Sequence, residues 1–258
     1  MSLTEEGSFL FDSAESLIKD FEQLDRSMRG RKKATNGTVT VSSPVEFGRK
    51  YVVPLIDSFS SQSPDVSFRL LFGDSDVNHV DCGCDVEIRF GALADCALTT
   101  RKLGEDSAIT CAAPAYLEQF GAPQCPAQLA DHNCLLFYDD RQAEDRWDYV
   151  VDDEAVVVRV VGNRLATDRR ALVDIALAGK GLIRTSAWNI ADQLAERTLI
   201  PVLESYRQAP TPIHLLTERR SLLPNRTIDF IDCTVSYFRR LNQRLSDVLA
   251  GPVETPVT

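Results

Sequence analysis

The sequence predicts an α/β protein built from two βαβ-rich halves. Three observations lead to this prediction. Short β-branched segments alternate with helical patterns, the first half resumes after the second, and the composition is that of a globular protein, with 258 residues of which 44% are hydrophobic and 26% charged. This length allows one large or two small domains. Strands that alternate with helices at this pace imply right-handed βαβ units and a largely parallel sheet.

The first predicted element is a helix with a heptad seam. Its apolar positions alternate spacings of four and three residues and are Leu10, Ala14, Leu17, Phe21, Leu24 and Met28. This strict period favours a partner helix over packing on the chain's own core, which is the alternative. We therefore assign residues 1–30 to a linker or dimerisation helix, with Gly30 as its stop.

The first half follows the helix and is completed near the end of the chain. We expect strands at 38–41, 66–72, 85–90 and 213–216, helices at about 45–59 and 225–249, and a short helical stretch at 77–81. We assign residues 38–111 and 212–249 to this subdomain I. Residues 250–258 form a tail that we expect to be flexible.

The second half is inserted within the first and covers residues 112–211, subdomain II. The strand expected at 107–111 ends subdomain I and leads into it. The strands expected after it are 134–138, 155–161 and 181–183, and the expected helices are 114–120, 168–177 and 188–197. In such architectures, ligands bind at the carboxyl ends of strands, in the cleft where the halves meet.

Two helix starts face this predicted cleft. Residues Ser42, Ser43, Val45 and Glu46 place hydroxyls and free backbone N–H groups at one of them, and Thr167 and Asp168 do so at the other. A helix N-terminus attracts anions, so two facing ends would hold a small carboxylate or polar effector. The simpler interpretation is that Ser43 and Asp168 only cap their helices, and the two roles are compatible.

Two strand ends add cations to this candidate site. Arg89 ends a strand that should be central, with Phe90 and Gly91 beside it, and its charge needs a ligand, a contact with the other half or a plain structural ion pair. Arg184 follows the same logic at the end of the strand that begins at Gly181. We keep both arginines as candidate ligand contacts.

Enzyme and metal chemistry are poorly supported by the motifs. The sequence has no G-x-S-x-G, H-E-x-x-H or P-loop pattern, and we expect no catalytic residue and no cofactor. His79, Cys82 and Cys84 crowd together, but no second ligand pair follows at zinc spacing, so we expect no metal. The seven scattered cysteines are most simply read as reduced thiols of a cytosolic protein.

Charge and hydropathy limit the partners further. The 28 Lys and Arg residues against 38 Asp and Glu residues give a net charge of −10. This field repels phosphate, so we do not expect the chain to bind nucleic acid by itself. The acidic N-terminus contains no apolar run of membrane length, which predicts a cytoplasmic protein without a membrane partner.

An ordered set of segments resembles the effector-binding region of LysR-type transcriptional regulators. These segments are residues 39–49 (VTVSSPVEFGR), 85–91 (DVEIRFG), 110–117, 131–135, 160–168 and 178–182. The resemblance covers nearly the whole chain to about Leu245. It implies a periplasmic-binding-protein-like fold, in which two Rossmann-like subdomains flank a hinged cleft and are joined by crossing strands near Ala112 and Pro210.

The resemblance also implies partners and site residues. The helix at 1–30 corresponds to the family's linker helix, which would pair subunits into a homodimer or homotetramer. The winged helix-turn-helix head that contacts DNA is absent from this chain, and we expect a truncated protein. Effector contacts carried over from the family fall on Ser43, Val45, Glu46, Asp74, Arg89, Phe90, Gly91, Thr167, Asp168 and, with less support, Arg184.

One departure from the family pattern bears on the effector. An aliphatic residue and a proline often follow the strand at Gly181, whereas this chain has Arg184, Thr185 and Ser186. The added cation favours an anionic ligand. Three alternatives stay open: a peroxide sensor using Cys125 and Cys134, a solute-binding protein of a transport system, and a lyase or deaminase of the same architecture.

Overall fold

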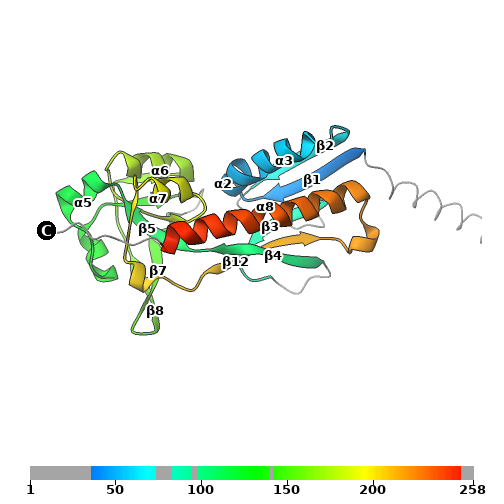
Figure 1. Ribbon diagram of the computed structural model, residues 1–258. Helices are drawn as coiled ribbons and strands as arrows, with labels where there is room; N and C mark the ends of the chain where they lie inside the picture. The colour runs from blue at the N-terminus through cyan, green and yellow to red at the C-terminus, as the bar shows by residue number, and fades with distance from the viewer. Residues whose placement is uncertain (1–35, 74–82, 94–97, 140–141, 251–258) are drawn as a thin grey trace, which may run out of the picture.

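The computed structural model describes residues 36–73, 83–93, 98–139 and 142–250. The predicted heptad helix, Asp74, the stretch 77–81 and the tail 251–258 lie outside these residues. The chain forms two lobes, each built on one sheet (Figure 1). No helix of the described part is long and apolar enough to span a membrane.

Subdomain I contains a five-stranded mixed sheet in the order β2-β1-β3-β12-β4. Its strands are β1 (Gly37–Ser43), β2 (Val66–Phe72), β3 (Val86–Phe90), β4 (Thr99–Asp106) and β12 (Thr211–Thr217). β1 pairs in parallel with β2 and β3, whereas β12 is antiparallel to β3 and β4. The largely parallel sheet that the sequence predicts is therefore correct only for the first three strands.

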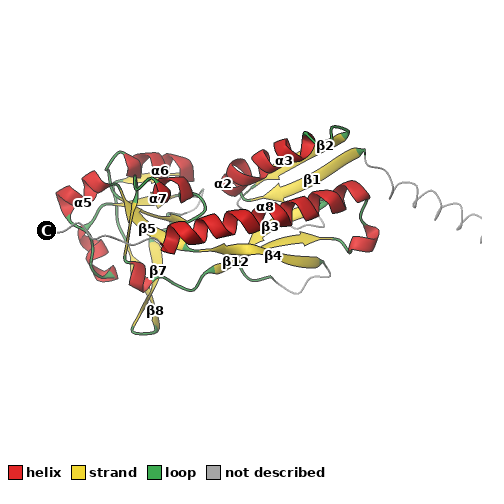
Figure 2. Ribbon diagram, in the orientation of Figure 1, coloured by secondary structure: helices red, strands yellow, loops and turns green. Residues whose placement is uncertain are grey.

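Helices cover this sheet on one face (Figure 2). α2 (Val45–Phe47), the π-helical turn η1 (Gly48–Val52) and α3 (Val53–Ser60) form one continuous segment, and the long α8 (Asn225–Ala250) lies beside it after the 3-10 turn η4 (Arg220–Leu222). Phe59 of α3 and Phe230 of α8 meet edge to face at 5.4 Å. Gly48 is required because a Cβ there would lie 2.5 Å from the ring of Phe72.

Subdomain II has the strand order β11-β5-β10-β6-β9. These strands are β5 (Ala108–Ala112), β6 (Cys134–Phe137), β9 (Arg164–Ala166), β10 (Leu182–Ser186) and β11 (Ile200–Val202). The helices are α5 (Pro114–Phe120), α6 (Arg169–Leu177) and α7 (Ala191–Ala195), with 3-10 turns η2 (Pro126–Asp131) and η3 (Glu204–Tyr206). A separate antiparallel hairpin pairs β7 (Arg146–Val151) with β8 (Glu154–Arg159).

The chain crosses between the subdomains twice. The first crossing is at Ser107, between β4 of the first sheet and β5 of the second, and the other lies between β11 and β12. The strand predicted at 107–111 was assigned to the end of subdomain I, whereas β5 pairs with β10 and β11 of the second sheet. Subdomain II therefore begins at Ala108.

One hydrophobic core runs through both subdomains. Its buried members include Phe47, Tyr51 and Phe238 from subdomain I and Val173 and Trp188 from subdomain II. The Trp188 side chain is 1% exposed, and its ring lies 5.6 Å from that of Phe47. The segment just before α7 is thus anchored in the core of the other subdomain.

Candidate functional site

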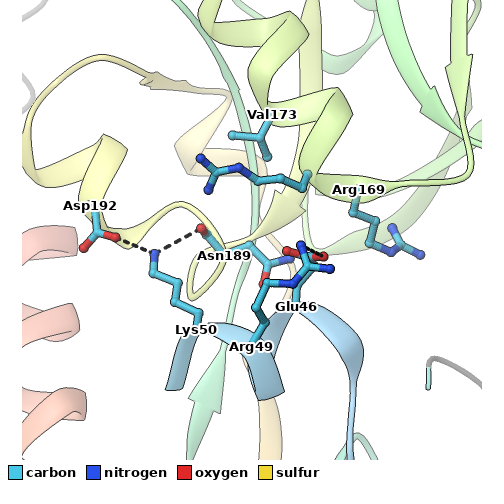
Figure 3. Close-up of a pocket in the computed structure, with 8 residues that line it drawn as sticks. Glu46, Arg49, Lys50, Arg169, Val173, Asn189 and Asp192 are labelled. Atoms are coloured by element: carbon cyan, nitrogen blue, oxygen red, sulfur yellow. Dashed lines mark hydrogen bonds and ion pairs between the residues drawn. The ribbon is translucent and has the colours of Figure 1, made fainter. Parts of the chain in front are cut away.

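A pocket of about 250 Å³ lies where the two subdomains meet (Figure 3). Subdomain I contributes side chains from α2 and η1, and subdomain II contributes side chains from α6 and from the segment that leads into α7. The lining residues are Glu46, Arg49, Lys50, Arg169, Arg170, Val173, Asn189 and Asp192. A molecule in this pocket would contact both subdomains at once.

Lys50 and Tyr51 connect the two walls of the pocket. The Lys50 Nζ lies 2.9 Å from Asp192 Oδ2 and donates to the carbonyl oxygen of Asn189 at 3.1 Å (Figure 3). The Tyr51 hydroxyl donates to the carbonyl oxygen of Trp188 at 2.6 Å. Both donors belong to the π turn η1, a kind of turn found frequently at functional sites.

The charges of the lining favour an anion. Four lining side chains are cationic and two, Glu46 and Asp192, are acidic. Arg169 and Arg170 open α6, where the partial positive charge of the helix terminus adds to the field. The predicted cap at Asp168 is confirmed, because its carboxylate accepts from the backbone N–H of Arg170 at 2.8 Å.

A second set of contacts lies at the first crossing. The Ser186 hydroxyl donates to Asp106 Oδ1 at 2.7 Å, and the indole N–H of Trp188 donates to the carbonyl oxygen of Glu105 at 2.8 Å. Burial raises the pKa of Asp106 to about 6, and hydrogen bonds from Ser186 and from backbone N–H groups partly offset this rise. The end of β4 is thereby tied to the end of β10.

The serines predicted for the site are buried on β1. Ser43 does not cap the following helix, because α2 starts after Pro44 without a side-chain capping bond and the Ser43 hydroxyl donates to the Pro44 carbonyl oxygen at 3.3 Å. The prediction of this cap is therefore wrong. Ser42 is 5% exposed, and Val45 is half-buried. Of this group, only Glu46 lines the pocket.

The two predicted arginines make structural contacts outside the pocket lining. Arg89 Nε donates to Glu87 Oε1 at 2.9 Å along β3, which matches the ion-pair interpretation. Arg184 donates to the carbonyl oxygen of Asp148 at 3.0 Å and lies over the ring of Tyr149. Both guanidiniums are thus engaged within their own subdomains.

Phe90, Gly91 and Thr167 are not among the lining residues of the pocket either. Phe90 packs its ring on Phe47 at 5.1 Å, and the Gly91 N–H donates to the carbonyl oxygen of Pro212 at 2.9 Å. Thr167 is exposed and precedes the α6 cap. The structure therefore brings together the helix starts at Glu46 and Asp168, but it does not bring the strand-end arginines to them.

Of the lining residues, only Glu46 was predicted from the sequence, and most of the others, among them Lys50, Arg170 and Asp192, are charged residues on helices or at their ends. Such residues are ordinarily solvated, so their type alone gives no signal. One signal was present: Arg169 and Arg170 directly follow the cap, although cations are disfavoured at the start of a helix. Two arginines at this position need acidic partners, and the structure gives Glu144 to Arg169 and Asp174 to Arg170.

The cysteines and histidines do not form a metal site within the described ranges. No group of three or more His, Cys, Asp or Glu side chains is placed there to hold a metal ion. Cys84 is disulfide-bonded, so the prediction of reduced thiols throughout is wrong at this position. Burial raises the pKa of Cys134 to about 12, which disfavours the thiolate needed for peroxide sensing. His132 contacts the Tyr116 hydroxyl through Nδ1 at 3.1 Å.

Comparison with known proteins identifies the family. Residues 32–239 match the LysR substrate binding domain. The chain belongs to this family. It is 26% identical over 221 residues to an uncharacterized HTH-type transcriptional regulator of Haemophilus influenzae, covering 86% of this chain and 76% of that protein. It is 24% identical over 209 residues to the HTH-type transcriptional activator TtdR of Escherichia coli K12, with coverages of 81% and 67%.

The fold agrees with solved structures of the same family. The full-length structure of AphB, a virulence activator of Vibrio cholerae and a member of the LTTR family, matches with a TM-score of 0.76 at 22% identity and covers 92% of this chain and 81% of that chain. The predicted periplasmic-binding-protein-like fold is confirmed. The matched proteins are transcriptional regulators rather than enzymes, and a transport solute-binding protein is not favoured. This LysR-type chain is an effector-sensing regulatory region.

Proposed function

We propose that this LysR-type chain senses a small anionic molecule in the pocket between its subdomains. The proposal rests on one observation, which is that both subdomains line the pocket. Arg49 and Lys50 come from one subdomain, and Arg170 and Asp192 come from the other. A ligand that contacts both walls favours one relative orientation of the subdomains. A coupling of about 1–3 kcal/mol is enough to change the output of such a sensor.

The proposed site shares some residues with the site predicted from the sequence, but its central cation is a different residue. Glu46 and the helix start capped by Asp168 remain, and Lys50 replaces Arg89 and Arg184 as the central cation. In the assembled regulator, we propose that the change in orientation reaches DNA through a helix-turn-helix head and through a homodimer or homotetramer. Because a transcription regulator acts on DNA, the proposed compartment is the cytoplasm.

A thermal-shift experiment tests this site. Small carboxylates are compared at low salt with their neutral amides, using the native chain, Lys50→Gln and Lys102→Gln. Lys102 is a matched control because it pairs with Glu105 on β4, outside the pocket lining. A carboxylate at about 100 times its Kd should raise the Tm by about 5–10 °C, whereas its amide should not.

The variants decide whether the pocket is responsible. The shift should be lost in Lys50→Gln and kept in Lys102→Gln. If every acid behaves like its amide, or if the shift survives in Lys50→Gln, the pocket is not the sensing site and the proposal fails.

A further inference from the structure

Two cations in the pocket are available to a ligand, and they belong to different subdomains. Arg49 lies 3.4 Å from Glu46, and Arg170 lies 3.4 Å from Asp174. The two arginine side chains are 60% and 51% exposed. Long ion pairs with an exposed arginine contribute little, so an acidic ligand can compete with Asp174, which is 58% exposed, and with Glu46, which is 18% exposed.

The other two cations of the lining, Arg169 and Lys50, make stronger contacts within the protein. Arg169 binds both carboxylate oxygens of Glu144, at 2.7 and 3.2 Å, and its guanidinium lies 3.7 Å from the centre of the Phe137 ring. Lys50 is held by Asp192 and by the Asn189 carbonyl oxygen, so it fixes the two walls of the pocket and adds its positive charge there without contacting the ligand directly. Bidentate and stacked arginines are strongly oriented, so a ligand that recruited Arg169 would have to break several contacts together.

Resting on the proposed function, we propose that the ligand is a small molecule with two acidic groups, one bound by Arg49 and the other by Arg170. Each of the four cations of the lining has a carboxylate partner, and the two long pairs, Arg49 with Glu46 and Arg170 with Asp174, are the ones that two acidic groups of a ligand could replace. The pocket of about 250 Å³ is below the roughly 300–1,000 Å³ of sites for drug-sized ligands, so the carbon skeleton must be short. Val173 gives this skeleton an apolar contact.

This arrangement makes the number of acidic groups the signal. A molecule with one acidic group satisfies one arginine and leaves the other with its own carboxylate. A molecule with two satisfies one arginine from each subdomain and therefore links η1 to α6. Only the second kind of ligand has a reason to prefer one orientation of the subdomains.

Calorimetric titration with succinate and with butanoate tests this inference, because both probes have four carbons and differ by one carboxylate. In the native chain, succinate should bind about tenfold or more tightly than butanoate, as expected for one added charge-assisted hydrogen bond. In Arg49→Gln and in Arg170→Gln, this ratio should fall to about two or less. Both side chains are more than half exposed, so the variants should fold.

Arg159→Gln is the matched control. It removes one positive charge from β8, where Arg159 pairs with Asp145 and lines a different recess. The succinate preference should persist in this variant, which separates direct contact from the general field of the protein. The double variant Arg49→Gln/Arg170→Gln should bind succinate at least as tightly as the product of the two single effects on affinity predicts. Any affinity above that product measures the coupling between the two arginines through the ligand.

The outcomes separate this inference from the proposed function. Equal affinities for succinate and butanoate, both lost in Lys50→Gln, would overturn the bridge and leave an anion pocket in place. A succinate preference that survives in Arg49→Gln and in Arg170→Gln would also overturn it. If neither succinate nor butanoate binds, both the bridge and the anion pocket are refuted.

Discussion

The hydroxyl of Tyr51 in subdomain I donates a 2.6 Å hydrogen bond to the carbonyl oxygen of Trp188 in subdomain II. The two rings meet edge to face at 5.1 Å. Burial raises the pKa of Tyr51 well above its usual value, so the hydroxyl keeps its proton at physiological pH. Tyr51 therefore helps Lys50 to fix the segment that carries Asn189 and Asp192 to the pocket.

Removing this hydroxyl should destabilise the protein. Tyr51→Phe leaves the Trp188 carbonyl oxygen buried without its donor, which costs about 1–2 kcal/mol and lowers the Tm by about 2–8 °C. Tyr237→Phe is the matched control, since Tyr237 is a half-buried tyrosine on the neighbouring α8. Thermal unfolding followed by circular dichroism measures the difference. Equal shifts in the two variants would contradict the assigned role of the Tyr51 hydrogen bond.

Truncating Trp188 should uncouple the subdomains. Its ring belongs to the core of both, so we expect the native chain to unfold in one transition and Trp188→Ala to lose about 3–5 kcal/mol and unfold in two. Trp147→Ala is a control of similar size, because Trp147 is buried within subdomain II alone. Calorimetry resolves the transitions. Two transitions in Trp147→Ala, or one in Trp188→Ala, would argue against Trp188 as the connection.

Asp106 should make stability depend on pH. Its pKa is raised from 3.8 to about 6 in the folded protein, because burial penalises the carboxylate. A raised folded pKa means that this group contributes stability below about pH 4, and the contribution of about 2–3 kcal/mol is lost as the pH rises through 6. In Asp106→Asn this part of the profile should be absent.

Urea unfolding gives the free energy of unfolding of the native chain and of Asp106→Asn at each pH between 4 and 7. The difference between these two free energies should change across this range. Glu105→Gln is the control, because the Glu105 side chain is 51% exposed and its removal should leave the profile in place. A difference between native chain and Asp106→Asn that stays constant across this range would show that Asp106 does not titrate as described.

Much of the fold could be predicted from local pattern. The strand 66–72 and the helix 114–120 agree with β2 and α5 at both ends, because turn residues flank each apolar run. β4 was missed because its sequence, TTRKLGED, is charged and Leu103 is its only buried hydrophobic residue. It is the edge strand of its sheet, and edge strands often carry charged residues that prevent pairing with other chains.

The site was less predictable than the fold, because its residues act through pairing across the subdomains. Arg89 is a cation at a central strand end, yet Glu87 two residues earlier on the same face of β3 already neutralises it. Lys50 looks like any exposed helical lysine until the fold brings Asp192 to 2.9 Å from its amine. The contacts that cross the pocket, from Lys50 to Asn189 and Asp192, join residues more than 100 positions apart, and no local pattern encodes them.

The strand order of subdomain I also constrains how the chain folds during synthesis. β12 lies between β3 and β4, so until residues 211–217 leave the ribosome β4 has no neighbour in its sheet and β3 has an open edge. The second sheet, by contrast, is contained in residues 108–202 and can close first. Domains usually fold from the N-terminus as they emerge, and the strand order leads us to expect the opposite order in this chain. The strands of subdomain I that are synthesised first keep exposed edges until β12 is made. During this interval a chaperone would protect the chain.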